Sequence, residues 1–376
     1  MGKHLVLVGG GHAHLTVLLN IADFVQRGHR VTLIGPSPHH YYSGMGPGML
    51  SGIYRPQEVR FQGKKMVEDR GGFFVEDRVI RINPDQRTLN LQSGNQIDYD
   101  VASFNTGSDV PLKSLVSAPR ENIIPVKPVF NLLQARRWII PRLKEKEMNF
   151  VVLGGGPAGL EVTANLWRLV QDNRGQARIT LIAGSRLLGG LSERVRTLAL
   201  GALNSKGIVV IEGKHGKEFA REEIRLVDGS SHSFDLAFVA LGVQPSSIFA
   251  DSGIPAGPDG GLLVNPYLQS VAHPEMFGGG DCISFAERPL AKVGVYAVRQ
   301  NPILRHNLLA ALEGKEMQPF IPQRDYMLIF NMGNGRGILW KKNFVWEGRL
   351  AFLLKDYIDR KFMKKFQVSG EREEKE

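Results

Sequence analysis

Short apolar runs alternate with stretches of helical periodicity along most of the chain. Residues 4–8 and 150–153 are nearly continuous apolar runs, and each leads through a glycine cluster into apolar positions at helical spacing. The first of these helices is expected at 15–24, and further apolar runs follow at 31–34 and 179–182. Strand, tight turn, helix and strand in this order is the pattern of a parallel βαβ unit. The sequence therefore predicts an α/β fold with two such units.

The two units resemble each other beyond their first strand and helix. The runs 99–108 and 234–242 both pass from an aromatic residue and Asp through apolar residues to Gly. After residue 250 the pattern indicates a return to the first unit, with a helix at 295–312 that ends at Gly314. We interpret this order as two Rossmann-like dinucleotide-binding domains, the second inserted in the first.

Residues 319–366 form a separate basic segment, with ten Lys and Arg against four Asp and Glu. Two strands, at 326–330 and 337–341, and a last helix are expected there, which makes a small C-terminal α+β segment. Apolar side chains share one face of that helix, namely Leu350, Leu353, Leu354, Tyr357 and Ile358. The face predicts contact with an anionic membrane surface, docking on the first domain, or a homodimer contact. The tail at 367–376 is expected to be disordered.

Composition limits both the chemistry and the location. No nucleic-acid motif accompanies the net charge of +10, so we expect no nucleic-acid partner. Cys282 is the only cysteine, which excludes an intrachain disulfide or a Cys-x-x-Cys pair, so redox chemistry has to use a bound cofactor. No apolar run approaches the about eighteen residues of a membrane span. The early first strand leaves no room for a signal peptide, which predicts a cytoplasmic protein, at most peripheral on the inner face of the membrane.

The two glycine clusters are the candidate binding sites. They read Gly9-Gly10-Gly11-His12-Ala13-His14 and Gly154-Gly155-Gly156-Pro157-Ala158-Gly159. Glycine lets the backbone approach a pyrophosphate, whose charge then faces the N-terminus of the following helix. Two such sites in one chain predict two bound dinucleotides and electron transfer between them.

These elements, in this order, resemble the two-dinucleotide-binding flavoprotein reductases of the pyridine nucleotide-disulfide reductase superfamily, and the likeness covers nearly the whole chain. Within that superfamily the chain is similar to type II NADH:quinone dehydrogenases and sulfide:quinone reductases. The segments 42–45, 297–300 and 355–363 resemble most the flavoprotein domains that are fused to selenide, water dikinase.

The resemblance implies a cofactor for each domain. FAD is expected in the domain formed by 1–125 and 250–318, and NADH or NADPH in the domain formed by 126–249. The implied FAD-binding residues are Gly9, Gly11, His12, Ala13, Gly46, Pro47, Thr106, Gly107, Gly280, Asp281, Val293 and Gly294. The residues implied for the nicotinamide dinucleotide are Gly154, Gly156, Pro157, Ala158, Gly159, Arg186 and Gly242. Asp281 would bond the ribitol chain, the loop at 39–54 would lie against the flavin or on the surface, and no metal is expected.

Two residues are candidates for catalysis. In similar reductases a Glu at the position of Glu161 lies near the nicotinamide and the flavin, where it bonds the carboxamide or relays a proton. The alternative is a first-turn acid that serves the helix dipole. Lys292, or the helix end that follows it, would stabilise the negative charge of reduced flavin. Cys282 is interpreted as a buried, small apolar residue.

The chain departs from the family pattern at three places. His14 stands where the third glycine of the first cluster is expected, so the packing of helix and strand there must be looser or rearranged. Gly35 and the segment 183–186 stand where each unit is expected to hold an acid for the adenosine ribose. An acid favours NADH and an Arg accommodates a 2′-phosphate, so Arg186 favours NADPH, unless the second site is degenerate.

The sequence thus predicts an FAD-dependent NAD(P)H dehydrogenase that passes hydride to FAD and then electrons to a quinone-like acceptor without redox cysteines. One alternative is the same flavin acting on a sulfur or selenium compound or on a small redox protein. Another is a non-catalytic, flavin-binding redox sensor whose nicotinamide site is vestigial.

Overall fold

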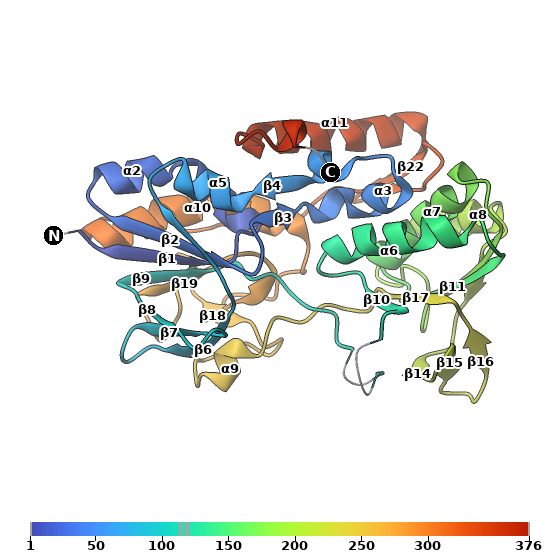
Figure 1. The fold of residues 1–376 in the computed structure, drawn as a ribbon, viewed down its shortest axis with the longest axis horizontal. Helices are drawn as coiled ribbons and strands as arrows, with labels where there is room; N and C mark the ends of the chain where they lie inside the picture. The colour runs from blue at the N-terminus through green and yellow to red at the C-terminus, as the bar shows by residue number, and fades with distance from the viewer. Residues whose placement is uncertain (1, 113–114, 117–119, 375–376) are drawn as a thin grey trace.

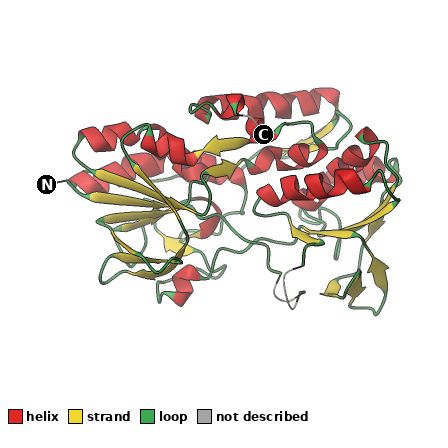
Figure 2. Cartoon of the chain, viewed as in Figure 1, coloured by secondary structure: helices red, strands yellow, loops and turns green. Residues whose placement is uncertain are grey.

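The computed structural model describes residues 2–112, 115–116 and 120–374. Two parallel sheets lie side by side, each with most of its helices on one side and a small antiparallel sheet on the other (Figures 1 and 2). This arrangement confirms the predicted α/β fold with two Rossmann-like units.

The first sheet has the strand order β19-β9-β1-β2-β5, and all its strands are parallel. Its interior strands are almost wholly apolar because both of their faces are covered. Leu5, Val6 and Leu7 of β1, for example, are fully buried. The strand bounds are β1 His4–Val8, β2 Arg30–Gly35, β5 Phe73–Glu76, β9 Val101–Phe104 and β19 Met276–Gly278.

After β9 the chain builds the second parallel sheet, in the order β10-β17-β11-β12-β13, and then returns to the first sheet with β19. The strand bounds are β10 Ile123–Pro125, β11 Met148–Leu153, β12 Ala177–Ile182, β13 Val209–Ile211 and β17 Leu236–Val239. The strands that precede the glycine clusters, β1 and β11, are central in their sheets. Each glycine turn therefore emerges at the carboxyl edge of a sheet, where ligands of this fold bind.

The remaining strands form small sheets around these two. In the first unit they are β3 His39–Tyr41 with β4 Arg60–Gln62, β6 Val79–Asn83 with β7 Thr88–Leu91 and β8 Gln96–Asp98, and β18 Leu262–Val264 with β20 Ile283–Phe285. In the second unit they are β14 Gly216–Phe219, β15 Glu223–Leu226 and β16 Ser231–Ser233.

The helices before the C-terminal segment include short 3-10 turns beside the glycine motifs. They are η1 His12–His14, α1 Leu15–Leu19, α2 Ile21–Gln26, η2 Ser43–Met45, α3 Gly46–Ser51, α4 Pro56–Val59, α5 Gly63–Glu68, α6 Phe130–Arg142, α7 Pro157–Asp172, α8 Glu193–Asn204, α9 Ile248–Asp251, η3 Gly280–Cys282 and α10 Gly294–Glu313. The predicted end of α10 is confirmed, because Gly314 caps it with φ 66°.

The first predicted helix is interrupted at Asn20. The Asn20 backbone leaves the helical region, with φ −115° and ψ 24°, and separates α1 from α2. Its side-chain amide donates a hydrogen bond of 2.7 Å to the Thr16 carbonyl, so the side chain replaces a backbone donor at the break.

The C-terminal segment holds one more strand than predicted. β21 Leu328–Asn331, β22 Gly337–Lys341 and β23 Phe344–Gly348 form an antiparallel sheet, and α11 Arg349–Phe366 follows. Figure 1 shows α11 on the same side of the molecule as α3 and α5. No helix among the described residues has the length and apolar character needed to cross a bilayer.

The apolar face of α11 is turned outward. Leu350, Leu353 and Tyr357 are 60%, 56% and 61% exposed, and the buried positions on the opposite side are Ala351, Lys355, Asp359, Met363 and Phe366. The expectation that the apolar face docks on the first domain is therefore wrong. The helix docks through a stripe that contains two charged residues.

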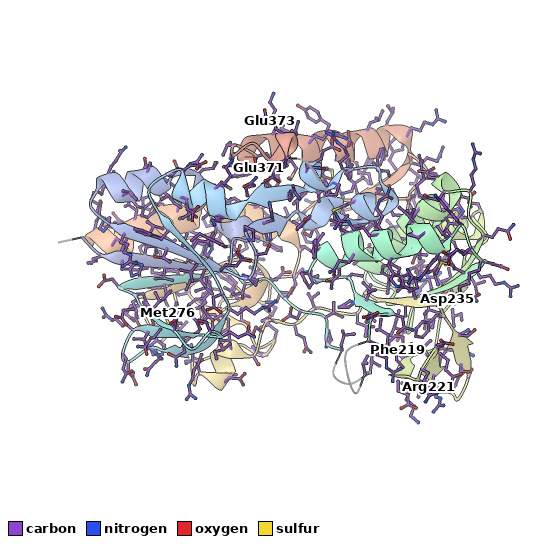
Figure 3. All side chains as sticks on the ribbon, viewed as in Figure 1. Phe219, Arg221, Asp235, Met276, Glu371 and Glu373 are labelled. Carbon is purple, nitrogen blue, oxygen red and sulfur yellow. The ribbon has the colours of Figure 1, made fainter. Side chains whose placement is uncertain are left out.

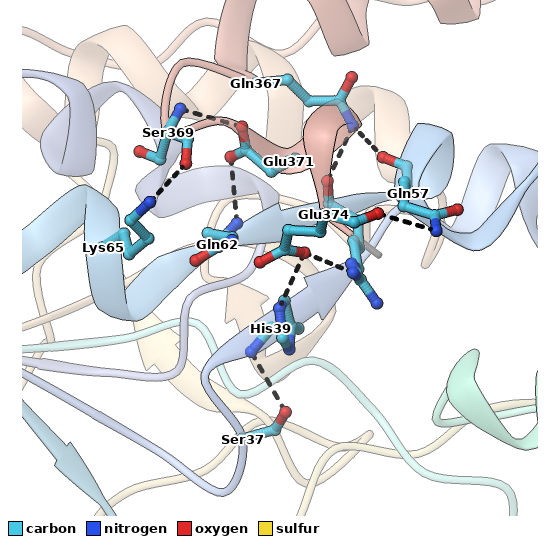
Figure 4. A network of polar contacts seen from close by, with 10 residues as sticks. Ser37, His39, Gln57, Gln62, Lys65, Gln367, Ser369, Glu371 and Glu374 are labelled. Atoms are coloured by element: carbon cyan, nitrogen blue, oxygen red, sulfur yellow. Dashed lines mark hydrogen bonds and ion pairs between the residues drawn. The ribbon is translucent and has the colours of Figure 1, made fainter. Parts of the chain in front are cut away.

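The expectation of a disordered tail is also wrong for residues 367–374. Glu371 is 1% exposed, and its carboxylate accepts hydrogen bonds from the backbone N–H groups of Gln62 in β4 (3.1 Å) and Ser369 (2.9 Å). Gln367 donates to the carbonyls of Gln57 and Arg60 in the same region (Figure 4). The tail satisfies backbone groups of the β4 region, so it is part of the fold. Residues 375 and 376 lie outside the described residues.

Glu371→Gln should lower the stability of the protein. One carboxylate oxygen becomes an amide N–H that faces a backbone donor, and an unsatisfied buried polar group costs about 1–3 kcal/mol. The midpoint of thermal unfolding should fall. Glu373→Gln is the matched control, because Glu373 is exposed and lies beside Glu371 at the end of α11 (Figure 3). Equal midpoints for the two variants would contradict the role of the tail.

Candidate active site

The second glycine turn is built for close packing at two positions and left open at a third. Gly154 has φ 129°, and Gly159 touches Gly154 so closely that a Cβ there would overlap the Gly154 carbonyl oxygen. A Cβ on Gly156 would meet nothing within 4 Å. Gly156 is also the N-cap of α7, whose first helical residue is Pro157. The open space faces a helix N-terminus, as an anionic pyrophosphate requires.

The first glycine turn is rearranged around His14. The His14 imidazole is fully buried, with Nδ1 2.6 Å from the Gly9 carbonyl and Nε2 2.8 Å from the Ser103 hydroxyl. A carbonyl only accepts, so Nδ1 carries the proton and Nε2 accepts from Ser103. Burial lowers the pKa of His14 to about 4, which keeps the ring neutral. The third glycine is thus replaced by a side chain that bridges the turn to β9.

Asn105, which the sequence analysis missed, joins the segments of the first site. Its side-chain oxygen accepts from the Ala13 N–H (3.0 Å), and its amide donates to the Gly279 carbonyl (2.5 Å). Gln300 of α10 then accepts from the Gly280 N–H (2.7 Å). Its position was the signal in the sequence, since Asn105 directly follows β9 and precedes the predicted Thr106 and Gly107. A Cβ on Gly11 would overlap the Asn105 side chain, so the first cluster needs glycine there.

Asp281 lies in η3, directly after Gly280, and forms an ion pair with Lys127. Its carboxylate accepts from Lys127 Nζ (2.7 Å) and from the Ser108 hydroxyl (2.9 Å). Burial opposes the charge, but the Lys127 ammonium outweighs burial and holds the pKa of Asp281 below its usual value. Asp281 and Val293 line one small pocket, and Gly294 begins α10 beside it. Cys282 is confirmed as buried, with Sγ 3.3 Å from the carbonyls of Phe104 and Gly279.

Lys292 lies against the same pocket but already has partners. Its ammonium is 2.7 Å from an Asp259 carboxylate oxygen and donates to the Ile283 carbonyl (2.5 Å). A cation already held in this way is poorly placed to stabilise charge on a bound group. The local contacts of Lys292 therefore do not favour the role expected for it, which was to stabilise the charge of reduced flavin.

Glu161 reaches a cluster that the sequence did not reveal. Its carboxylate accepts from the Asn331 N–H of β21 (2.7 Å) and interacts electrostatically with Lys355 and Asp359 of α11. Burial raises the pKa of Glu161, Lys355 lowers it and Asp359 raises it, and the net direction is upward. Lys355 donates to the Gly44 carbonyl (2.8 Å), which joins α11 to the segment after β3, and the electrostatic interaction with Glu161 links α7 to the same lysine.

The segment at 39–54 is not the loop that its composition suggested. It forms β3, η2 and α3, and Gly46 and Pro47 are buried in α3. A Cβ on Gly46 would lie 2.8 Å from the Val129 side chain, so this glycine permits packing next to α6. The surface-loop alternative is excluded for these two residues.

The predicted positions at the edge of the second unit lie near the surface. Gly242 is exposed, and Arg186 is 46% exposed and forms an ion pair with Glu193. Ala158 follows Pro157 in the first turn of α7. Arg186 is therefore within reach of a ligand at the end of β12, but an acid already balances its charge.

Two histidines next to the first glycine turn each have a ring nitrogen without a hydrogen-bond partner among the described residues. The Nε2 atoms of His12 and His40 are buried and form no hydrogen bond with the described residues, and their ring centroids are 5.1 Å apart. Burial lowers the pKa of His12 to about 3 and that of His40 to about 4. His12 also contacts the Tyr42 ring at 5.2 Å. Unsatisfied polar atoms beside a glycine turn fit a site that is completed by a bound polar group.

Each glycine turn lies at the carboxyl edge of a parallel sheet, and the first of them borders this cluster through His12. A family model described as pyridine nucleotide-disulphide oxidoreductase matches residues 3–302. The chain belongs to this family. The family uses FAD and NAD(P)H, which agrees with the two cofactors expected from the glycine clusters.

Known proteins extend the likeness over most of the chain. Ferroptosis suppressor protein 1 of Xenopus tropicalis is 25% identical over 350 residues, which are 89% of this chain and 87% of that protein. The NDH2 structure from Plasmodium falciparum, in complex with NADH, has a TM-score of 0.81 at 14% identity and covers 98% of both chains. The sulfide:quinone oxidoreductase of Aquifex aeolicus has a TM-score of 0.80 at 17% identity, over 98% of this chain and 92% of that one. The narrower likeness to proteins fused to selenide, water dikinase stays a prediction.

Proposed function

We propose that this family member is an FAD-dependent NAD(P)H dehydrogenase with a quinone-type acceptor. The observation that carries the proposal is a chain of contacts that links the two glycine-turn regions. His12 of the first turn packs on Tyr42, and the Tyr42 hydroxyl donates to Asp359, which pairs with Lys355. Glu161, which follows the second turn, interacts electrostatically with both members of that pair. A hydride acceptor and a hydride donor have to meet at such a junction. The quinone follows from likeness, because a structural neighbour is named for a quinone.

The chain offers each cofactor a distinct set of groups. We propose FAD for the domain of residues 1–125 and 250–318, with the first glycine turn at the pyrophosphate and Asp281 at the ribitol. NAD(P)H then belongs to the domain of residues 126–249, with Gly156 and the N-terminus of α7 at its pyrophosphate. When bound, FAD supplies the hydride-accepting and electron-donating chemistry.

The proposed reaction needs one proton besides the hydride. NAD(P)H and a quinone yield NAD(P)+ and a quinol, in which the hydride brings both electrons and one hydrogen nucleus. The second proton has to come from the protein or from water. Glu161 suits this task, because burial raises its pKa and so favours a bound proton.

The outward face of α11 supports a membrane location for the acceptor. Its apolar residues lie beside exposed lysines, including Lys361, Lys364 and Lys365, a pattern typical of helices in an anionic membrane interface. We infer a peripheral position on the inner face of the membrane for an otherwise cytoplasmic protein. A homodimer contact through the same face is the alternative.

An anaerobic titration tests the function. The visible absorbance of the bound flavin should bleach within seconds on addition of NADH or NADPH, and the faster of the two identifies the preferred dinucleotide. A long-chain quinone carried in anionic vesicles should then restore the colour faster than the same quinone in neutral vesicles. A flavin that stays oxidised would favour the redox sensor, whereas bleaching without reoxidation by quinone would favour a sulfur, selenium or protein acceptor.

A further inference from the structure

The buried stripe of α11 carries charge where a helix normally carries apolar residues. Lys355 is 9% exposed and Asp359 is 4% exposed, one helical turn apart, with Nζ 2.9 Å from the Asp359 carboxylate. Burying two charges is costly unless they are paired and their remaining hydrogen-bonding capacity is satisfied. The cost indicates that the pair has a function beyond attaching the helix.

The other hydrogen bonds of the pair are directed at the segment beside the first glycine turn. The Tyr42 hydroxyl donates to the second Asp359 oxygen (2.9 Å), and Lys355 donates to the Gly44 carbonyl (2.8 Å). Burial, together with the Asp359 charge, keeps Tyr42 neutral by raising its pKa. Both oxygens of Asp359 thus accept a hydrogen bond. The Lys355 ammonium is held between the Asp359 carboxylate and the Gly44 carbonyl.

Lys355 therefore interacts with two carboxylates, those of Asp359 and Glu161, and the interaction with Asp359 is the more direct. Asp359 contacts it directly, whereas Glu161 interacts with it through space and has a backbone N–H, that of Asn331, as its own partner. The charged and titratable groups around Glu161 are Lys355 and Asp359 of α11 and Tyr42 of the neighbouring segment. One cation balances only one of the two carboxylates, and burial, the largest effect on the pKa of Glu161, favours a bound proton on Glu161.

We propose that Asp359 is a positioning residue which, together with Tyr42, fixes Lys355 and thereby determines when Glu161 holds and releases its proton. This inference rests on the proposed function. As the quinol forms, the O–H bond of Glu161 breaks and an O–H bond forms on the acceptor, whose electrons come from the nicotinamide hydride. The Glu161 carboxylate that remains is stabilised by Lys355 until water returns a proton.

Opposite shifts for two substitutions test the inference. Asp359→Asn removes a negative charge near Glu161 and frees Lys355 to pair with it, so Glu161 should ionise at lower pH than in the wild type. Lys355→Met removes the stabilising cation, so Glu161 should ionise at higher pH. A merely structural role would not predict opposite directions.

The readout is the midpoint potential of the bound flavin as a function of pH, measured on the holoprotein without any acceptor. The slope of midpoint potential against pH changes at the pH where Glu161 ionises, and we call this pH the break. The break should move to lower pH in Asp359→Asn and to higher pH in Lys355→Met. The double variant removes both members of the Lys355–Asp359 pair, so neither is left as an unpaired buried charge and the fold should be retained, and its break should lie between the two. Asp356→Asn is the matched control, because Asp356 belongs to the same helix but pairs with Arg360 (2.9 Å), and it interacts with Lys355 only electrostatically and less strongly than Asp359 does.

Equal breaks in all variants, or shifts of the same sign in Asp359→Asn and Lys355→Met, would overturn the inference. A shift in Asp356→Asn as large as that in Asp359→Asn would do the same, because the effect would then be general charge. Since this titration needs no quinone, it can succeed even where the vesicle experiment fails. Failure of the proposed acceptor and failure of the positioning role are therefore separate outcomes.

Discussion

Gly156→Ala should slow reduction of the bound flavin strongly at subsaturating NAD(P)H and leave the fold intact. A Cβ at residue 156 enters open space and so disturbs no protein atom, but this space lies at the N-terminus of α7, where the pyrophosphate is proposed to bind. We expect the Kd for NADH and NADPH to rise about 100-fold, equivalent to ~2.8 kcal/mol. The rate of flavin bleaching in stopped flow, measured at several dinucleotide concentrations, gives this Kd. The midpoint of thermal unfolding should equal that of the wild type.

Gly159→Ala is the matched comparison in the same turn. Its Cβ would overlap the Gly154 carbonyl oxygen, so the backbone must shift. Overpacking of this kind costs about 1–3 kcal/mol or more, and the melting temperature should fall. If Gly156→Ala bound NAD(P)H as tightly as the wild type, the proposed nucleotide site would be wrong.

Asp281→Ala should give a protein that loses FAD. Asp281 would no longer bond the ribitol, and loss of a hydrogen bond to a charged group costs about 1.5–3 kcal/mol, or roughly 10-fold or more in FAD affinity. Lys127 would also lose its ion pair with Asp281. The ratio of flavin to protein after gel filtration measures the loss. Asp259→Ala is the control, because its pair with Lys292 is 42% exposed on the carboxylate side.

The same carboxylate sets a pH dependence for FAD retention. Its folded-state pKa is lowered, so its contribution is fully present at neutral pH and is lost as the pH falls through that lowered value. The wild type should therefore release flavin in acid more steeply than Asp281→Ala, which has already lost the titrating group. Parallel acid-release curves for the two proteins would contradict a role for this residue.

The sequence could predict those parts of the fold that depend on local pattern. The strands before the glycine clusters, the return to the first sheet and the end of α10 at Gly314 all follow from apolar runs and from glycine. The break at Asn20 and the bridging role of His14 escaped the analysis. Both depend on hydrogen bonds to carbonyl and hydroxyl groups that only the folded backbone brings close.

The orientation of α11 could not be predicted for a different physical reason. Hydrophobic periodicity assigns the apolar stripe to the interior, but here Lys355 and Asp359 are buried and Leu353 is exposed. Because buried charges are satisfied by distant partners such as Tyr42, no local pattern reveals them. For the same reason the contacts of Lys355 could not be predicted. Glu161 could be named as a candidate because it follows a glycine motif.

The pairing of β9 with β19 has a consequence for the order of folding. Ala102 and Met276 are neighbours in one sheet, yet the whole second sheet is made between them. Closing so long a loop is entropically expensive while the intervening chain is unstructured, and it becomes cheaper once that chain is compact and its two ends are near each other. The pairing of β19 with β9, and the α10 contacts that depend on it, are therefore expected to form late. The second sheet folds first and brings the two ends together, which allows the first sheet to be completed.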